Sequence, residues 1–583
     1  MDCDKLDLSE KIRVRFDNGW ELMKNNKNSE AISYIKETIA YIIQNLKTLD
    51  EGEMKNKCTI QLALTHLRLS TLYVDEEDLK AGEEQLEKCI DLLKDKEMET
   101  DAITPLITAL NQQGFILSQW KQPLKAKVVL HRAEQIFQNY TKDNKEYKIP
   151  RADFNTIQEV HDEVVLKEVF EKLHTMTLFY LAQIYTSLQD HYMSAIYCHM
   201  TLRRQLYHNE VMHDLDHIDW ALNAATLSQY FLEIEGFTQA RYHLGAASYI
   251  LQVYEDKLKK KTEVNGQTEA VAADWENFKD KSADVARCWA KYGLILLISS
   301  KERLLELSEE DEENDQANKK ENSKPKLKED LKFEVLEGKI EPIINQITDK
   351  YLLDFDDARR VFLNVQKWLD QAMSYYTFDD HASDYVHIVQ DLSQAYNYLS
   401  FYEESEDRKA KMHKRRVDIL ENVEKELNPQ FYKAACRQIW FELGETYSGI
   451  LQIKFDRLNT TNKNPQAVMK INNLAQNSIK YFQKFIDSLE TNSSDPENPK
   501  YSDDVLRPAL FSYFQIGRMY SKMIPPDFVD NIANSIKAYK FVVDYCDKYP
   551  AAAEVMKFEL NHCKELVSLL TILYENKKKI KNC

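Results

Sequence analysis

Apolar residues recur three and four positions apart along most of this chain, which is the spacing of one buried face of an α-helix. The pattern is clearest between residues 175 and 251, where small residues stand among larger apolar ones. The small residues there are Ala182, Ala195, Ser228, Ala240 and Ala247. Two helices cross closely where a small residue lies at the nearest approach and bulkier side chains lie above and below it. The stretch therefore predicts two consecutive antiparallel helix pairs.

The N-terminal part of the chain predicts further pairs of the same kind. Residues 1–50 predict two helices, and residues 62–93 and 109–140 predict one helix pair each. Small residues fall at equivalent places in four pairs, at Ser70, Gly114, Ala182 and Ser228, with irregular steps between them. We interpret the pairs as degenerate repeats separated by insertions. Asp216 is placed to cap the helix that follows it.

Two stretches near the C-terminus identify the type of repeat. Trp440, Leu443, Gly444 and Tyr447 match the pattern W-x2-L-G-x2-Y of the first helix in a tetratricopeptide repeat. The same pattern returns at residues 513–520, with Tyr513 in place of Trp. In such a repeat the second helix returns antiparallel against the first, and stacked pairs form a cupped wall.

The middle of the chain differs from both ends. Residues 256–270 predict a loop and residues 275–305 a helix, and residues 308–330 form a charged tract with too few apolar side chains to bury. We predict an all-α fold, a tetratricopeptide-like, right-handed solenoid of antiparallel helix pairs in two subdomains joined by a linker helix. The expected boundaries are 1–300 for the first subdomain, 301–345 for a charged, partly disordered loop and linker, and 346–583 for the second.

Composition narrows the possible functions. Only 12 Gly and 13 Pro occur in 583 residues, which favours long helices with short connections over a sheet-rich fold. The formal net charge of −18 argues against nucleic acid and anionic membranes as partners, and it favours a basic protein partner or simple solubility. Nine scattered Cys without a paired spacing indicate a reducing compartment. We expect a cytoplasmic monomer with no membrane insertion.

Motifs for catalysis and metal binding are missing from the sequence. It contains no phosphate-binding glycine loop, no H-E-x-x-H and no G-x-S-x-G, so we predict no enzyme activity and no cofactor. His208, His213 and His217 lie close in sequence to Asp214 and Asp216, as metal ligands often do. A polar loop between helices explains these residues better than a metal site. The basic run 409–416 predicts a solvated helix face, because acidic residues precede it at pairing distance; a nuclear signal or an acidic-partner patch is the alternative.

Eight short blocks along the chain resemble the kinesin-binding protein family, also called KIF-binding protein. They are FYLAQIY (179–185), LRRQL (202–206), WALNAATLSQ (220–229), KMHKRR (411–416), LNPQFY (427–432), KINNL (470–474), DVLRPAL (504–510) and KFVVDYC (540–546). The blocks occur in the family's order and span most of the chain. The first 60 residues or so and residues 256–345 depart from the family pattern, so nothing is transferred to them.

This resemblance implies a non-enzymatic solenoid that binds the motor domain of a subset of kinesins and blocks their attachment to microtubules. The implied roles lie in microtubule organisation and axonal transport, with a cytoskeleton-associated location. The family's contacts with the motor concentrate on the concave side of the N-terminal repeats. The matching residues in this chain are Tyr180, Gln183, Gln205, Thr226 and Gln239.

The repeat pattern supports part of this set. Tyr180 and Thr226 each lie two residues before a small packing residue, and Gln183 and Gln229 each lie one residue after it. Both pairs therefore present the same positions toward the groove, and Gln229 joins the candidate partner-binding residues. Tyr, Gln and Thr suit adaptable hydrogen bonding around an aromatic anchor. The alternative is that the glutamines are merely solvated and that Tyr180 is a core residue with its hydroxyl at the rim.

Two other functions compete with motor binding. A co-chaperone that grips acidic C-terminal tails needs Lys and Asn at successive groove positions, where this chain has Phe179, Gln183, Ala225 and Gln229. A structural scaffold of a larger complex is the second alternative. Binding to a kinesin motor separates both from the first interpretation.

Overall fold

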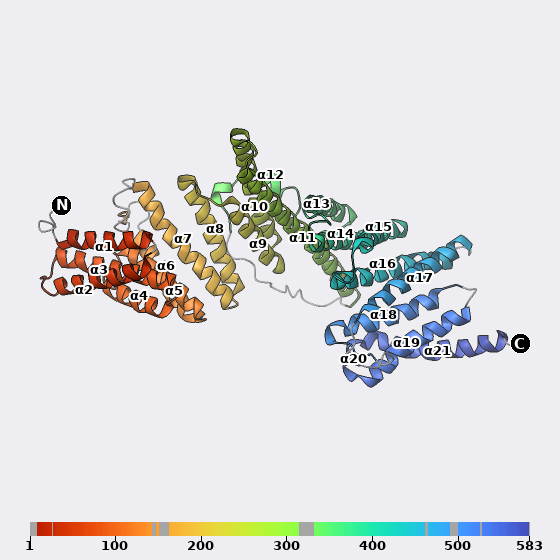
Figure 1. Ribbon diagram of the computed structural model, residues 1–583. Helices are drawn as coiled ribbons and strands as arrows, with labels where there is room; N and C mark the ends of the chain where they lie inside the picture. The colour runs from red at the N-terminus through yellow and green to blue at the C-terminus, as the bar shows by residue number, and fades with distance from the viewer. Residues whose placement is uncertain are drawn as a thin grey trace. The chain divides into compact units, whose positions relative to one another are not determined.

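The computed structural model describes residues 8–25, 27–142, 147–150, 163–313, 331–460, 465–489, 499–524 and 528–581 (Figure 1). Over these residues the chain forms α-helices and a short 3-10 helix, and no strand. The predicted all-α class is confirmed, and so is the arrangement as a solenoid of consecutive antiparallel helix pairs. Among the described residues, no helix combines the length and apolarity that crossing a membrane requires.

The helices of the first half are α1 (Leu8–Lys24), α2 (Asn28–Leu46), α3 (Glu53–Asp75), α4 (Leu79–Leu93), α5 (Ile103–Gln119), α6 (Pro123–Thr141), α7 (Glu163–Ser187), α8 (His191–Met212), α9 (His217–Glu233) and α10 (Phe237–Asn265). Those of the second half are α11 (Glu269–Glu313), η2 (Glu334–Leu336), α12 (Glu341–Ile344), α13 (Phe355–Met373), α14 (Ala382–Tyr402), α15 (Glu406–Glu426), α16 (Lys433–Thr460), α17 (Pro465–Ser488), α18 (Asp503–Lys522), α19 (Phe528–Lys548), α20 (Pro550–Val555) and α21 (Lys557–Lys581).

The chain divides into two compact units. Unit 1 consists of residues 1–256 and 323–343, and unit 2 consists of residues 257–322 and 344–583. The boundary after residue 256 falls within α10, whereas we expected the first boundary near residue 300. Residues 331–343 belong to unit 1 although the chain on either side of residues 323–343 belongs to unit 2.

The turns within four helix pairs of unit 1 repeat one geometry. Glu77, Lys121, Gln189 and Glu235 all have positive φ, with values of 62°, 56°, 61° and 56°. The backbone N–H of the next residue bonds to the carbonyl five residues back in each turn, which is the Schellman motif that ends a helix. Each of these residues lies seven positions after the small packing residue predicted at 70, 114, 182 or 228. The four pairs are therefore structural repeats in a common register.

Glycines and serines set the closest helix crossings. A Cβ added to Gly114 would lie 2.6 Å from Leu130, and one added to Gly444 or Gly517 would lie 2.9 Å from a ring of Phe482 or Tyr539. In unit 2 the second helix also hydrogen-bonds across the crossing. Ser478 Oγ donates to the Gly444 carbonyl and Ser535 Oγ donates to the Gly517 carbonyl, both at 2.8 Å. The two tetratricopeptide matches therefore mark true helix pairs, α16 with α17 and α18 with α19.

The predicted loop at residues 256–270 was wrong. α10 continues to Asn265 and α11 begins at Glu269, so only a short turn separates them, with Gly266 at a φ of 68°. Leu258 and Val271 are buried, and Trp275 Nε1 donates to Thr262 Oγ1 at 2.9 Å. Lys and Glu are good helix formers, and two buried contacts suffice to pair two charged helical ends. Of the charged tract, residues 314–330 lie outside the described residues.

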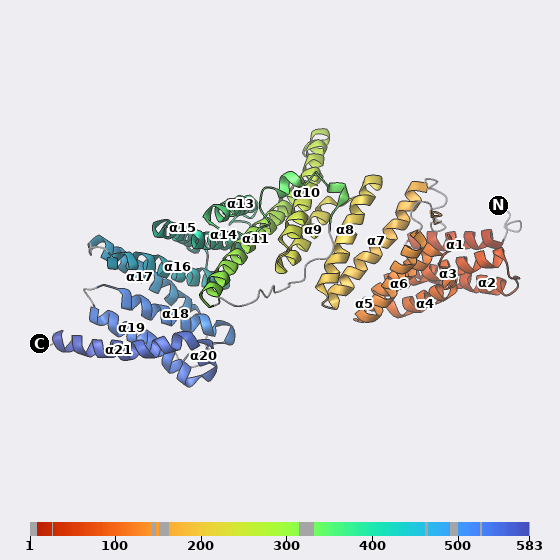
Figure 2. The same cartoon turned by 180° about the vertical axis from the view of Figure 1, so that it is seen from behind.

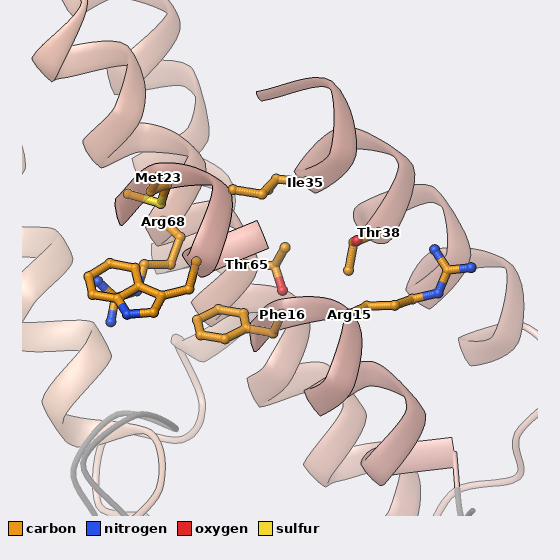
Figure 3. A pocket seen from close by; sticks show the side chains of 8 residues that line it. Arg15, Phe16, Met23, Ile35, Thr38, Thr65 and Arg68 are labelled. Atoms are coloured by element: carbon orange, nitrogen blue, oxygen red, sulfur yellow. The ribbon is translucent and has the colours of Figure 1, made fainter. Parts of the chain in front are cut away.

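A small cavity among α1, α2 and α3 is lined by Phe16, Trp20, Ile35 and Arg68, among others (Figure 3). Its volume is about 10 Å³, which is the space of a single water molecule at most. The Arg68 guanidinium lies 4.3 Å from the centre of the Trp20 ring, and burial lowers its pKa to about 10. We read this cavity as a packing defect beside a cation–π contact, not as a ligand site.

Candidate partner-binding surface

One face of α7 leaves a row of large side chains exposed. Met176 and Phe179 are each 47% exposed, Gln183 is exposed and Tyr180 is half-buried. These positions are three or four residues apart, so they share one face of the helix, while Leu178, Leu181 and Ala182 fill the opposite face. Burial raises the pKa of Tyr180, so its hydroxyl stays protonated and donates or accepts hydrogen bonds. Neither Met176 nor Phe179 was predicted as a partner-binding residue, because an exposed apolar residue on a helix can have the same spacing as a core residue.

An aromatic side chain from α5 extends this row. The half-buried Phe115 ring lies 6.2 Å from the Tyr180 ring, and the Phe179 ring lies 5.8 Å from it on the other side. α5 packs directly against α7. The first helices of two neighbouring pairs therefore contribute to one continuous aromatic surface.

The exposed face of α9 is polar. Asn223 and Thr226 are exposed, and acidic Asp219 and Glu233 are exposed at the two ends of the same row. Asp216 caps this helix by accepting a bond from the Asp219 backbone N–H at 3.0 Å, which confirms the predicted cap. α9 thus exposes carboxylates and hydrogen-bonding groups, whereas α7 exposes aromatic and apolar side chains.

Gln229 is less available than Gln183. It is half-buried, its Nε2 donates to Ser228 Oγ at 3.1 Å, and its buried Oε1 has no hydrogen-bond partner. The equivalence of the two glutamines in the repeat therefore does not extend to their exposure. Ser228 thus satisfies the amide nitrogen of Gln229, whereas the amide oxygen has no donor among the described residues.

The remaining two candidates lie on second helices. Gln205 is half-buried on α8, two positions from the exposed Arg203 and therefore about 200° around the helix from it. Gln239 is half-buried and lies in the first turn of α10, where its carbonyl accepts a bond from His243 Nδ1 at 2.8 Å. The structure gives no contact that joins these two glutamines to Tyr180.

The histidines near residue 213 do not gather into a metal site. His208 is buried and bonds Glu168 at 2.6 Å and Thr175 at 2.8 Å, while His217 Nδ1 donates to the Leu215 carbonyl. His213 ends α8 with a φ of 53°. Over the described part of the chain, no group of three or more His, Cys, Asp or Glu is placed to hold a metal ion.

A segment that sequence reasoning missed packs onto unit 1 from far along the chain. We call residues 331–340 the strap. Phe333, at its centre, is 1% exposed and lies in an aromatic slot formed by His199, Trp220, Tyr242 and His243, with ring centres 4.6–5.9 Å away. Leu336 and Ile340 of the strap are also buried.

Polar contacts fix the register of the strap. The Phe333 N–H donates to the Tyr242 hydroxyl at 2.9 Å, and that hydroxyl in turn donates to the Phe333 carbonyl. Arg203 on α8 forms a bidentate pair with Glu334, with Nε at 2.8 Å from Oε2. In Figures 1 and 2 the green segment that contains η2 lies beside α8 and α10, as these contacts require. The strap therefore fills a hollow of unit 1 rather than linking helices as an open loop.

Comparison with known proteins shows which family has this architecture. The family profile described as "KIF-1 binding protein C terminal" matches residues 218–576. The proteins named KIF-binding protein from Homo sapiens and Gallus gallus are 35% and 34% identical, over 89% and 90% of this chain and 84% and 89% of theirs. The chain belongs to the KIF-binding protein family.

Other relatives support this assignment. The KIF-binding protein of Drosophila melanogaster is 32% identical over 90% of this chain and 87% of its own length. A solved structure described as "Cryo-EM map of KIFBP" covers 98% of this chain with a TM-score of 0.63, 26% identity and 100% of its own length. The family profile includes Thr226, Gln229 and Gln239, whereas the other three candidates precede its start.

Proposed function

We propose that this chain binds the motor domain of kinesins through the exposed faces of α7 and α9. The bound motor is then unable to attach to a microtubule. The relatives' name, KIF-binding protein, supports a kinesin partner. The observation that carries the choice of surface is the row of Met176, Phe179 and Tyr180, because large apolar side chains left exposed in a row mark a contact site.

The chemistry of the two faces suits such a partner. A motor surface that binds the acidic surface of tubulin must be basic. The exposed carboxylates of Asp219 and Glu233 on α9, in a chain of net charge −18, attract a basic surface. Tyr180 and Phe179 then supply the desolvated anchor, and Gln183 and Thr226 supply hydrogen bonds. A motor held in this way has its microtubule-binding face covered.

The proposal includes a non-enzymatic role in the cytoplasm, associated with the cytoskeleton, in microtubule organisation and axonal transport. The co-chaperone alternative gains no support. Of the positions where a clamp for acidic tails needs Lys and Asn, Phe179 is an exposed aromatic residue and Ala225 is buried. No observation on the described residues favours a scaffold over a motor-binding protein.

The test is a binding measurement with a purified kinesin motor domain. Replacement of Tyr180, Gln183, Gln205 and Thr226 by Ala together should weaken binding at least about 100-fold, because a central aromatic anchor and its hydrogen-bonding neighbours are removed. The single change Phe179→Asp should weaken it by a similar factor, since it places a carboxylate in the centre of an apolar contact. Helical content by circular dichroism should stay unchanged in both.

The matched control uses α6, where Leu124 and Val128 are each 69% exposed. Leu124→Asp and Val128→Asp remove exposed apolar surface and add charge in the same way, but on the second helix of an earlier pair. We expect binding within about two-fold of the unaltered protein. Equal losses in the α6 and α7 variants, or unchanged binding in all variants, would contradict the choice of surface. No binding of the motor domain to the unaltered protein would contradict the proposed function.

A further inference from the structure

Unit 2 contains an open basic cavity at the junction of α13, α14 and α15. Its volume is about 650 Å³, which is in the range of sites that bind ligands. Five cationic side chains line it, namely Arg359, Arg408, Lys411, Lys414 and Arg415, against the two carboxylates of Glu403 and Asp418. The lining therefore carries a net formal charge of +3, in a chain whose net charge is −18.

Three of these cations have no partner within the part of the chain that the structure describes. Arg408 pairs with Glu403 and Lys414 pairs with Asp418, each at 2.9 Å. Arg359, Lys411 and Arg415 are exposed, and among the described residues they form no ion pair or hydrogen bond. Arg359 comes from α13 and the other two from α15, so separate elements bring three free positive charges to one cavity.

The basic run of α15 thus serves two purposes. Arg416 is buried and bonds Glu442, Ser393 and Asn397, and Lys409 pairs with Glu406. The pair of Lys409 with the preceding Glu406 agrees with the predicted solvated face, whereas the burial of Arg416 contradicts it. Lys411 and Arg415 point to the cavity side instead, which the sequence could not distinguish.

A buried acceptor lies among the cations. Glu403 follows α14 and its side chain is 1% exposed. Its Oε1 accepts bonds from Arg408 and from the Ser405 backbone N–H, whereas its Oε2 is buried with no hydrogen-bond partner. A buried carboxylate oxygen without a donor is costly. Within the described residues, three cations of the cavity therefore have no carboxylate partner, and Glu403 Oε2 has no hydrogen-bond donor.

We propose that the basic cavity binds an acidic peptide segment of a partner protein. Carboxylate side chains of such a segment match the fork of Arg359 and Arg415 and the ammonium of Lys411. Its backbone N–H groups supply the donor that Glu403 Oε2 lacks. Apolar side chains of the segment pack on Phe355, Tyr396 and Met412, which also line the cavity. This function goes beyond motor binding, because the site lies in unit 2 and selects the opposite charge.

The same features disfavour other anions. A phosphate or a lipid phosphate carries concentrated negative charge and, when fully ionised, no donor, so Glu403 would repel it and remain unpaired. The net charge of −18 also opposes adsorption to an anionic membrane. A peptide with spaced carboxylates and backbone N–H groups satisfies both halves of the lining.

The test uses the full chain and a fluorescein-labelled hexapeptide, Glu-Glu-Phe-Glu-Glu-Glu, with fluorescence polarisation as the readout. The triple variant Arg359→Glu, Lys411→Glu and Arg415→Glu should weaken binding at least about 30-fold, because three charge-assisted contacts become repulsive. No binding of the peptide to the unaltered protein would overturn the proposal. Equal binding of phosphatidylserine vesicles through the same three residues would also overturn it, in favour of a membrane site.

A matched control separates the cavity from the general field of the protein. Lys367→Glu, Lys425→Glu and Lys470→Glu change the net charge by the same amount at exposed positions of α13, α15 and α17 that do not line the cavity. Binding should stay within about three-fold of the unaltered value. An equal loss in both triple variants would show that only overall charge matters and would overturn the proposal.

The variant Glu403→Gln separates a peptide from a simple anion. It removes one negative charge, so the affinity for inorganic phosphate rises if the cavity is an anion site. If a peptide N–H donates to Oε2, as proposed, the same variant weakens peptide binding by about tenfold, because a charged acceptor becomes neutral. A stronger interaction of the peptide with Glu403→Gln would overturn this assignment. Circular dichroism confirms that each variant is folded.

Discussion

The aromatic slot of unit 1 and the basic cavity of unit 2 are each formed by three consecutive helices, but their contents differ. The slot lies on α8, α9 and α10 and is filled by Phe333 of the chain itself. The basic cavity lies on α13, α14 and α15, and the three cations that have no partner among the described residues remain accessible. The same repeat architecture thus produces one hollow that is part of the core and one that is open.

The difference follows from the kind of surface, apolar or charged, that each hollow exposes to water. An empty slot of four aromatic rings would expose apolar surface, at a cost of about 25 cal/mol for each Å². Unpaired Arg and Lys side chains are instead well solvated, and an open charged cavity has no such cost. A solenoid must therefore fill its apolar hollows, whereas it can keep a charged hollow available for a partner.

The largest expected effect comes from emptying the slot. Phe333→Ala should lower the free energy of unfolding of unit 1 by about 3–5 kcal/mol, as for other fully buried Phe residues. Hydrogen exchange in α8, α9 and α10 should become much faster, with little change in α16–α19. Slow exchange in α8–α10 of this variant would mean that the strap is only loosely attached and would remove the basis of the comparison.

Acid should also weaken the filled hollow. Burial lowers the pKa of His199 to about 4 and that of His243 to about 3. As the pH falls below about 6.5, the unfolded chain binds protons that the folded slot does not, so stability is complete above that pH and is lost on further acidification. At pH 5 we expect a loss of about 2 kcal/mol for each histidine. Thermal unfolding and hydrogen exchange at pH 7.5 and 5.0 measure it.

The variant Phe333→Ala provides the control for this prediction. Its slot admits water to both imidazole rings, so their pKa values return toward the ordinary value and the pH dependence should shrink. An undiminished pH dependence in this variant would assign the acid sensitivity to other buried histidines, such as His174, whose pKa burial also lowers, to about 3.

Salt should distinguish the open cavity from the surface of α7. We expect the affinity of the acidic peptide to fall about tenfold between about 50 and 300 mM NaCl, because its contacts are between exposed charges. The motor contact combines the uncharged Met176, Phe179 and Tyr180 with the carboxylates of Asp219 and Glu233, and its uncharged part does not respond to salt, so its salt dependence should be smaller. Titrations at several salt concentrations compare the two slopes, and a steeper slope for the motor would reverse the assignment.

The smallest effect is expected for stability when the charges of the basic cavity are reversed. Arg359, Lys411 and Arg415 make no bond within the described chain, so their replacement by Glu should change the free energy of unfolding by less than about 0.5 kcal/mol. Urea denaturation checks this. A change above about 2 kcal/mol would make these cations structural, and the two hollows would then be alike.

The sequence predicted what local spacing determines. The small residues at 70, 114, 182 and 228, and the pattern around Gly444, identified helix pairs correctly, because a close crossing constrains residues only a few positions apart. Gln183 and Thr226 are exposed on helix surfaces and Tyr180 is half-buried beside them, whereas their role as a binding site stays a prediction. Gln229 shows the limit, since Ser228 beside it changes its exposure.

Contacts between distant parts of the chain could not be predicted in this way. The strap lies among charged residues, and nothing in its own spacing indicates that Phe333 pairs with Tyr242, 91 positions earlier. Likewise, the cavity depends on Arg359 approaching α15, and a single basic run does not reveal which of its members face a neighbouring helix. Both features arise from tertiary packing, which sequence periodicity does not encode.

The strap has a consequence for the order in which the protein is made. When the ribosome has passed Tyr242 and His243, all four residues of the slot have been made, but Phe333 lies 91 positions after Tyr242. At 5–20 residues per second, the nascent chain keeps four aromatic rings uncovered for roughly 5–20 s. The first unit is therefore finished only after all of α11 has been translated. This interval is when the growing polypeptide is most exposed to chaperones and to misassembly.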